Sequence, residues 1–252
     1  MSRSLKSCVS RPTILTTVVV KYRVLFITDS RGRGLRDYLY ANPIHGVATE
    51  CHYKPGANLE QLAIDAIQSL SNDRYDFCAI IGGICSFTEL FQVGNEKRLC
   101  YPLESRAQKT RRAIETVRDL KGRFGSKIVI HTIIPASLLK FFFIKNQAVN
   151  FYHNIEREQN ALLEDLEEVN DIITALNQRS GISTCNLSNR FTSHSLKRER
   201  QFPGRITHRL SRFRDAHLTD GVHPNEDFRH KCFRAVCRAL KKDLQTIYGL
   251  VC

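Results

Sequence analysis

Two short stretches of the sequence carry residue types that could do acid–base chemistry together. The stretch LTDGVHPN, residues 218–225, places Asp220 three residues before His223. An imidazole can accept a proton, and a carboxylate beside it can orient the ring and stabilise its charged form. Such a pair acts on a nucleophile that another part of the chain must supply.

Ser30 is the candidate nucleophile. It lies in FITDSRGRG, residues 26–34, where the apolar run 23–29 ends and a turn with two glycines follows. A serine at a strand–helix junction lies at the positive end of a helix dipole, beside backbone N–H groups that could bind an oxyanion. The alternative is that Ser30 is only the N-cap of a helix, since serine is a preferred residue there.

The apolar runs predict the strands that would position these residues. Runs rich in β-branched and aromatic residues occupy 23–29, 77–83 and 127–134, a weaker candidate occupies 46–53, and a poorer one occupies 183–188. The best runs are continuous rather than alternating, which is typical of strands buried on both faces of a parallel sheet.

Amphipathic segments separate these runs. Apolar residues recur every three or four positions over 59–70, 113–120, 155–178 and 226–247, and each pattern predicts a helix. The alternation of strands and helices predicts an α/β fold, a three-layer α/β/α sandwich around about five parallel strands, as in flavodoxin-like proteins. Ligands bind at the carboxyl ends of such strands, where Ser30 would lie.

Four short blocks, in order, resemble the signature blocks of the SGNH, or GDSL-type, hydrolases: TDS (28–30), the glycine of KPGAN (54–58), GGIC (82–85) and DGVH (220–223). The resemblance spans about residues 22–246. It implies a single SGNH-hydrolase-like domain over 22–248, after a basic N-terminal tail at 1–21. It further implies hydrolysis of acyl esters, thioesters or acetyl esters, with no cofactor and no metal.

The resemblance also implies a role for each matching residue. Ser30 would be the nucleophile, His223 the general base and Asp220 its orienting partner. The backbone N–H groups of Ser30 and Gly56 would bind the oxyanion. The third block of the family usually supplies an asparagine to this oxyanion hole, but this sequence has Cys85 there, and a thiol is a weak donor.

Cys85 therefore predicts a weakened site. Loss of one oxyanion-hole donor typically lowers turnover by about 10²–10³-fold. Asn58, two residues after Gly56, is a possible substitute donor. Cys85 could instead be a nucleophile paired with His223, but no cationic residue in IIGGICSFT would lower its pKa, so a structural thiol fits the sequence better.

The net charge of +13 predicts attraction to an acidic partner. The segment 189–214, just before the DGVH block, is rich in arginine and lysine and is expected to form a basic loop insertion. Clusters of this size bind phosphates with a strong dependence on salt. The candidate polyanion-binding residues are Arg198, Arg200, Arg205, Arg209, Arg212 and Arg214. The alternative is a solvated basic face that only keeps the protein in solution.

Three functions follow from these features. The complete Ser30–His223–Asp220 set favours an SGNH-type serine hydrolase acting on ester bonds. Cys85 and the basic segment favour an SGNH-like module that binds RNA, DNA or another polyanion, and a domain of this fold that binds RNA is known. Segments such as LTDGVHPNEDFRHK also resemble small SGNH-like proteins of invertebrate mobile elements and viruses.

The third possible function is that of an interaction protein with KFFFIKN, in the long connection 135–154, as its contact surface. These phenylalanines could instead line an acyl pocket or pack inward.

The nine cysteines are odd in number and form no CxxC pair. This pattern predicts free thiols, no zinc site, and an intracellular protein of a reducing compartment, cytoplasmic or nuclear. No apolar run approaches the roughly 18 residues of a membrane span, and the run TILTTVVV (13–20) is too short and too close to charged residues for a signal peptide.

Overall fold

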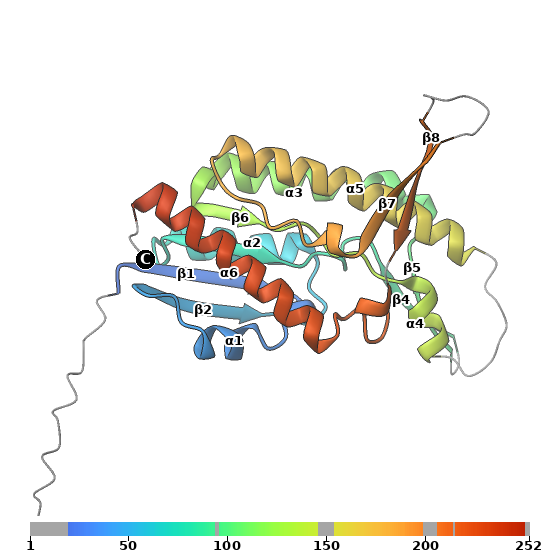
Figure 1. Cartoon of the computed structure of the whole chain (residues 1–252), viewed down its shortest axis with the longest axis horizontal. Coiled ribbons are helices and arrows are strands. Elements are labelled where there is room, and N and C mark those ends of the chain that lie inside the picture. The colour runs from blue at the N-terminus through green and yellow to red at the C-terminus, as the bar shows by residue number, and fades with distance from the viewer. Residues whose placement is uncertain (1–19, 94–95, 146–153, 199–205, 214, 250–252) are drawn as a thin grey trace, which may run out of the picture.

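The computed structural model describes residues 20–93, 96–145, 154–198, 206–213 and 215–249 (Figure 1). Most of the predicted basic tail, 1–19, lies outside the described residues. The four best apolar runs form one parallel sheet in the order β2 (Val47–Tyr53), β1 (Tyr22–Thr28), β3 (Phe77–Ile81) and β6 (Ile128–Ile130). Thr28 pairs with both Tyr53 and Ile81, so three strands end side by side.

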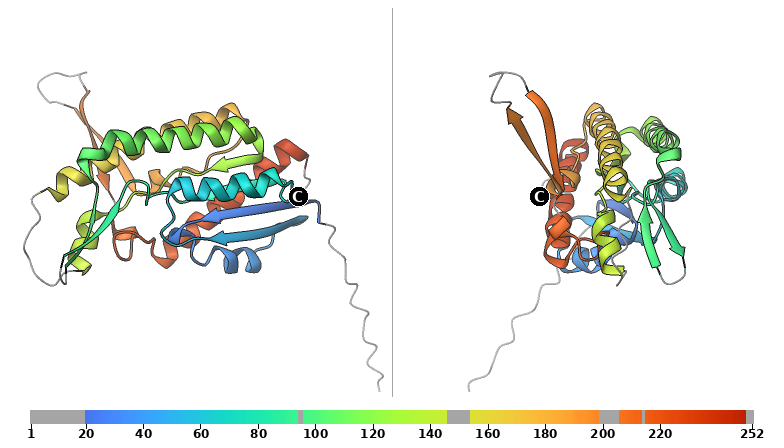
Figure 2. Two further views of the ribbon diagram at one scale, coloured as in Figure 1. Left: turned by 180° about the vertical axis from the view of Figure 1, so that it is seen from behind. Right: turned by 90° about the vertical axis from the view of Figure 1, so that its right-hand side faces the viewer.

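Helices cover both faces of this sheet, which confirms the three-layer α/β/α prediction (Figures 1 and 2). One face is covered by α2 (Leu59–Ser71), α3 (Arg106–Phe124), α4 (Leu138–Lys145) and α5 (Ile155–Arg179). The other is covered by α1 (Leu35–Ala41) and α6 (Glu226–Tyr248). Short 3₁₀ helices are η1 (Ser30–Gly32), η2 (Leu103–Ser105), η3 (Gly125–Lys127), η4 (Ser188–Arg190) and η5 (Asp215–His217).

Strand β1 shows why its sequence is apolar without alternation. Leu25 and Ile27 pack into the core beneath α2, α3 and α5. Val24 and Phe26 point to the opposite face and pack against α1 and α6. All four side chains are fully buried, because successive residues of a strand face opposite sides and both sides are covered here.

The predicted fifth strand is wrong, because residues 183–188 have no strand conformation. Side chains of α5 bond to the backbone beside β6 instead. The Asn177 amide donates to the Ile130 carbonyl at 2.7 Å. The Asn170 amide accepts from the Ile133 N–H at 2.6 Å and donates to the Ile133 carbonyl at 3.1 Å. These amides satisfy backbone groups that a further strand would otherwise pair with.

Two predicted loops contain regular structure. The connection 135–154 includes helix α4, in which Phe141 and Phe142 are buried and Phe143 is half exposed. The phenylalanines therefore pack mainly inward, as their apolar character favours. Residues 146–153 lie outside the described residues.

The described strands of the basic segment 189–214, β7 (Thr192–Arg198) and β8 (Ile206–Phe213), pair as an antiparallel hairpin. Its threonine and isoleucine residues favour strands even though the segment is highly charged. The hairpin projects from the body of the molecule in both figures. A second hairpin, β4 (Glu89–Val93) with β5 (Glu96–Cys100), was missed, although Gly94 and Asn95 between its strands are typical hairpin-turn residues.

The seven cysteines within the described residues are all free thiols. In the same part of the chain, no helix has the length and apolarity that crossing a membrane requires.

Candidate active site

A buried aspartate fixes the turn that carries Ser30. Asp29 caps η1, and its fully buried carboxylate accepts hydrogen bonds from the Arg31 N–H at 2.9 Å and the Gly83 N–H at 3.0 Å. Ser30 itself is half-buried at the first position of η1, directly after β1. The cap is thus Asp29, and the alternative interpretation of Ser30 as the N-cap is wrong.

Two glycines allow this turn to pack closely. A Cβ atom on Gly82 would lie 2.6 Å from the Asp29 carboxylate, and the φ of Gly82 is +146°. A Cβ atom on Gly32 would lie 1.9 Å from Oγ1 of Thr28. Both contacts are shorter than any side chain tolerates, so the turn after β1 and the start of the GGIC block require glycine for steric reasons.

The DGVH block forms a tight loop around one carboxylate. Oδ2 of Asp220 lies 2.8 Å from Nδ1 of His223. Oδ1 accepts from the N–H groups of Val222 at 3.0 Å and His223 at 2.8 Å. Because Nδ1 faces a carboxylate, the neutral ring carries its proton there and Nε2 is left as the proton acceptor.

The electrostatics of this pair favour an ionised carboxylate. Burial opposes the charge on Asp220, but hydrogen bonds from the His223 ring and from the His223 and Val222 N–H groups outweigh it. The pKa of Asp220 is consequently held well below its ordinary value. A carboxylate that stays charged can stabilise an imidazolium when His223 accepts a proton.

Helix α4 holds this loop in place. The Ser137 N–H donates to the Gly221 carbonyl at 2.7 Å. Gly221 has a φ of +87°, and a Cβ atom there would lie 2.5 Å from the backbone of Ser137 and Phe141. Only glycine permits this approach. The sequence did not reveal this contact, because the segment carrying α4 was expected to be a long connection.

Ser30, Asp220 and His223 line one pocket of about 400 Å³, which we call the Ser30 pocket. The turn η1 after β1 contributes the serine and the loop before α6 contributes the pair, at the end of the sheet where the strands terminate (Figure 1). The remaining lining residues are Arg31, Arg33, Tyr53, Thr219, Pro224, Glu226 and Arg229. Sequence reasoning did not select the arginines, although two of them lie in SRGRG directly after the candidate nucleophile.

Gly56, Asn58 and Cys85, which were predicted for the oxyanion hole, are not among the lining residues of the Ser30 pocket. Gly56 lies in the exposed turn between β2 and α2 with a φ of +75°. Within the described residues, neither its N–H nor the Ser30 N–H donates a hydrogen bond to another group. Asn58 caps α2, its Oδ1 accepting from the Gln61 N–H at 2.8 Å. Cys85 and Asn58 both line a second pocket of about 350 Å³ rather than the Ser30 pocket.

The surroundings of Cys85 do not favour a thiolate. Burial raises the pKa of this half-buried thiol, the negative charge of Asp29 raises it further, and Arg31 opposes both effects. A cysteine nucleophile requires a lowered pKa. The geometry therefore supports the structural interpretation of Cys85.

The predicted polyanion-binding residues are only partly described. Arg198, Arg209 and Arg212 belong to the hairpin strands β7 and β8. Arg200, Arg205 and Arg214 lie outside the described residues. In the described part of the chain, no group of three His, Cys, Asp or Glu side chains is arranged to hold a metal ion.

Comparisons with known proteins identify the fold. No protein-family model and no curated protein sequence matches the chain. A lipase/acylhydrolase from Enterococcus faecalis is 12% identical, over 88% of this chain and 96% of that one, with a TM-score of 0.56. A GDSL-like lipase from Bacteroides thetaiotaomicron is 13% identical, over 88% of each chain, with a TM-score of 0.52. An acetylxylan esterase from Geobacillus stearothermophilus is 13% identical, over 90% of this chain and 95% of that one, with a TM-score of 0.51. The chain thus has the fold of the SGNH hydrolases.

Proposed function

We propose that this chain is a serine hydrolase that cleaves ester bonds. The observation that carries the proposal is the 2.8 Å contact of His223 with Asp220 in a pocket that Ser30 also lines. A nucleophile, a base and a group that orients the base are the three parts that such catalysis needs. The acylhydrolase, lipase and esterase of the same fold support acyl or acetyl esters as the substrate class.

The reaction would proceed through an acyl-enzyme. Ser30 Oγ attacks the ester carbonyl while Nε2 of His223 accepts the hydroxyl proton. The tetrahedral intermediate collapses, the C–O bond to the alcohol breaks, and His223 returns the proton to the leaving oxygen. His223 then takes a proton from water, whose oxygen attacks the acyl-Ser30 carbonyl. The C–O bond to Ser30 breaks, His223 returns the proton to Ser30 Oγ, and the acid is released.

The oxyanion would be stabilised chiefly by backbone groups. The Ser30 and Gly56 N–H groups have no partner among the described residues, so both are free to donate. Cys85 occupies the position of the usual asparagine and adds little. Because Oδ1 of Asn58 caps α2, only the amide NH₂ of Asn58 could act as the substitute donor.

Labelling with a fluorophosphonate probe tests this proposal, because the probe reacts with activated serines. We expect the wild type to be labelled at Ser30 and labelling to be lost in Ser30→Ala and His223→Ala. Ser105→Ala is the matched control, because Ser105 lines the second pocket and not the Ser30 pocket. A folded wild type that is not labelled, or labelling that survives in Ser30→Ala, would contradict the proposal.

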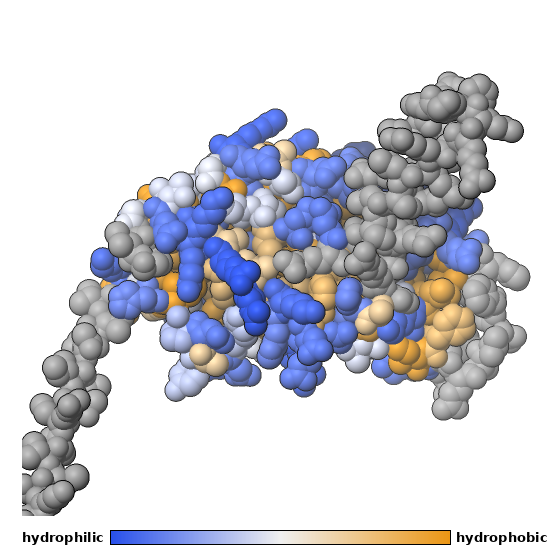
Figure 3. All heavy atoms as spheres, in the orientation of Figure 1, coloured by the Kyte–Doolittle hydropathy of each residue, from blue (hydrophilic) through white to orange (hydrophobic). Residues whose placement is uncertain are grey.

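The exposed face of α6 supports a second candidate function, polyanion binding. Lys231, Arg234, Arg238 and Lys241 are exposed on it, and within the described residues none forms an ion pair with an acidic side chain. They extend over about 15 Å of helix, and hydrophilic side chains gather over α6 in Figure 3. A row of unpaired cations is suited to the phosphates of a nucleic acid.

Binding of single-stranded RNA at several salt concentrations tests this second function. The triple substitution Arg234→Gln, Arg238→Gln and Lys241→Gln is expected to weaken binding at least about tenfold. It should also reduce the slope of log K against log salt by about 2, because three phosphate contacts are removed. The control of equal charge is Arg111→Gln, Arg112→Gln and Arg118→Gln on α3. An equal loss in that control would contradict a role for α6.

A further inference from the structure

Three arginines line the Ser30 pocket beside the candidate catalytic residues. They are Arg31 and Arg33, directly after Ser30, and Arg229 on the first turn of α6. The ester chemistry proposed above requires none of them. Their presence therefore needs a separate explanation.

Arg31 is a buried cation with unused donors. It is 2% exposed, and its Nη1 donates to the Ile134 carbonyl. Its Nε and Nη2 have no hydrogen-bond partner among the described residues. Burial lowers the pKa of Arg31, while the negative charge of Asp29 raises it. Unpaired buried donors of a charged group are costly, so Arg31 keeps a positive charge and unused hydrogen-bonding capacity beside the pocket.

Arg33 and Arg229 add charge at the same pocket. Arg33 is exposed and Arg229 is half-buried, and neither forms an ion pair with a described acidic side chain. Glu226 also lines the pocket, one turn before Arg229, but no ion pair joins the two. The other carboxylate of the lining, Asp220, is already bonded to His223. The acids of the pocket thus leave the arginines available.

We propose that the Ser30 pocket binds an anionic group, phosphate or carboxylate, carried by the ester substrate. The inference rests on the proposed hydrolase function and narrows its substrate class to esters of anionic molecules. Guanidinium groups bind both anions through paired hydrogen bonds. A pocket of about 400 Å³ has room for such a group beside the ester.

Matched acetyl esters test the proposal. The anionic substrates are 4-acetoxyphenyl phosphate and 4-acetoxybenzoate, and the neutral one is 4-methylphenyl acetate. We expect kcat/KM to favour at least one anionic ester about tenfold or more, and the comparison of the two identifies which anion is preferred. Arg33→Gln/Arg229→Gln should remove this preference. Arg36→Gln/Arg118→Gln removes equal charge from exposed positions outside the pocket and should keep it.

A binding measurement separates this inference from the hydrolase proposal. Inorganic phosphate and benzoate are titrated separately into Ser30→Ala, in which catalysis is not required, and into Ser30→Ala with both pocket substitutions. Binding that is lost only with the pocket substitutions supports the anion site even when the wild type fails to react with the fluorophosphonate probe. A labelled wild type with no preference for either anionic ester, or a Ser30→Ala protein that binds neither phosphate nor benzoate, would overturn the inference.

Discussion

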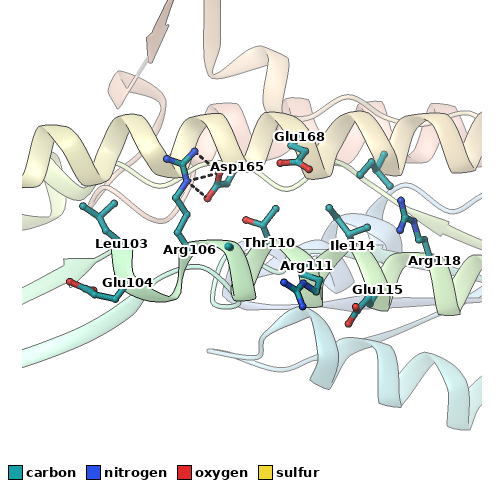
Figure 4. A pocket seen from close by; sticks show the side chains of 12 residues that line it. Leu103, Glu104, Arg106, Thr110, Arg111, Ile114, Glu115, Arg118, Asp165 and Glu168 are labelled. Carbon is teal, nitrogen blue, oxygen red and sulfur yellow. Dashed lines mark hydrogen bonds and ion pairs between the residues drawn. The ribbon is translucent and has the colours of Figure 1, made fainter.

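The Ser30 pocket and the larger groove between α3 and α5 differ in what their charged groups contact. The groove, about 630 Å³, is lined by Arg106 and Asp165 among others (Figure 4). Arg106 lies 2.7 Å from Asp165 and 2.9 Å from Glu164, and the Tyr101 hydroxyl donates to Asp165. In the Ser30 pocket, by contrast, Arg33 and Arg229 have no described acidic partner.

The groups that line the two pockets are a better guide to function than the pocket volumes are. In the α3–α5 groove, the central pair of Arg106 and Asp165 joins two helices that cover the same face of the sheet, and the remaining lining charges are two arginines and three glutamates. In the Ser30 pocket, the bonded pair is His223 with Asp220, the candidate base and its candidate orienting group, and Arg33 and Arg229 have no described acidic partner. The smaller pocket is therefore the stronger functional candidate.

The largest effect is expected when the Ser30 hydroxyl is removed from the Ser30 pocket. Ser30→Ala should lower ester turnover by about 10³–10⁴-fold, because His223 then has no hydroxyl to activate. The free energy of unfolding should change little, since Ser30 is only half-buried. Hydrolysis of 4-methylphenyl acetate and chemical denaturation measure the two quantities. A variant that keeps its turnover would remove the Ser30 pocket from consideration as an active site.

Two substitutions at the candidate oxyanion-hole positions test whether the second pocket contributes to catalysis. Cys85→Asn introduces a donor at the edge of the second pocket, and we expect kcat to rise by up to about 10²–10³-fold if its amide reaches the oxyanion. Asn58→Asp is the paired test of the substitute donor. It keeps an oxygen to cap α2 but removes the amide NH₂, and it should lower kcat about tenfold or more if Asn58 serves the oxyanion. Unchanged activity in both variants would exclude this side of the site from catalysis.

The sequence predicted the parts of the fold that depend on local pattern. The continuous apolar runs identified β1 and β3 because both faces of those strands are covered. The short blocks indicated Ser30 and the Asp220–His223 pair as candidates because the proposed chemistry fixes their residue types, and all three line one pocket. These features need no knowledge of distant contacts.

The parts it did not predict depend on contacts between distant segments. The fifth strand is replaced by amide side chains from α5, which no property of residues 183–188 reveals. Gly221 supports the candidate site through its contact with Ser137 of the α4 region, and that contact exists only in the folded chain. Whether an arginine is paired, as Arg106 is, or free, as Arg33 is, also depends on tertiary structure.

The stability of the protein is expected to depend on pH through His131, which directly follows β6. It is 1% exposed, its Nδ1 accepts from the Cys185 N–H at 3.3 Å, and its Nε2 has no described partner. Burial lowers the pKa of His131 to about 4. The unfolded chain, with an ordinary pKa near 6.5, binds this proton first as the pH falls.

Stability should accordingly fall between about pH 7 and pH 4, by up to about 3 kcal/mol from this residue. His131→Asn keeps an acceptor for the Cys185 N–H and removes the titration. Its free energy of unfolding should therefore depend less on pH over that range. Equal pH dependence of the free energy of unfolding in the wild type and the variant would mean that His131 does not control acid stability. Activity assays above pH 7 avoid the effect of His131 in either case.

The smallest expected effect tests the α3–α5 groove. Asp165→Asn removes the charge that Arg106 and the Tyr101 hydroxyl both contact. Asp165 is buried but Arg106 is 38% exposed, so solvent compensates part of the loss, and we expect a stability loss of about 1–2 kcal/mol. Ester turnover per folded molecule should stay the same, because none of these residues lines the Ser30 pocket. Thermal denaturation and turnover, measured on the same sample below the unfolding transition, separate the two outcomes. Asp165→Asn could instead lower turnover as Ser30→Ala does while the protein remains folded. That result would mean that the α3–α5 groove takes part in catalysis and is not only a structural feature.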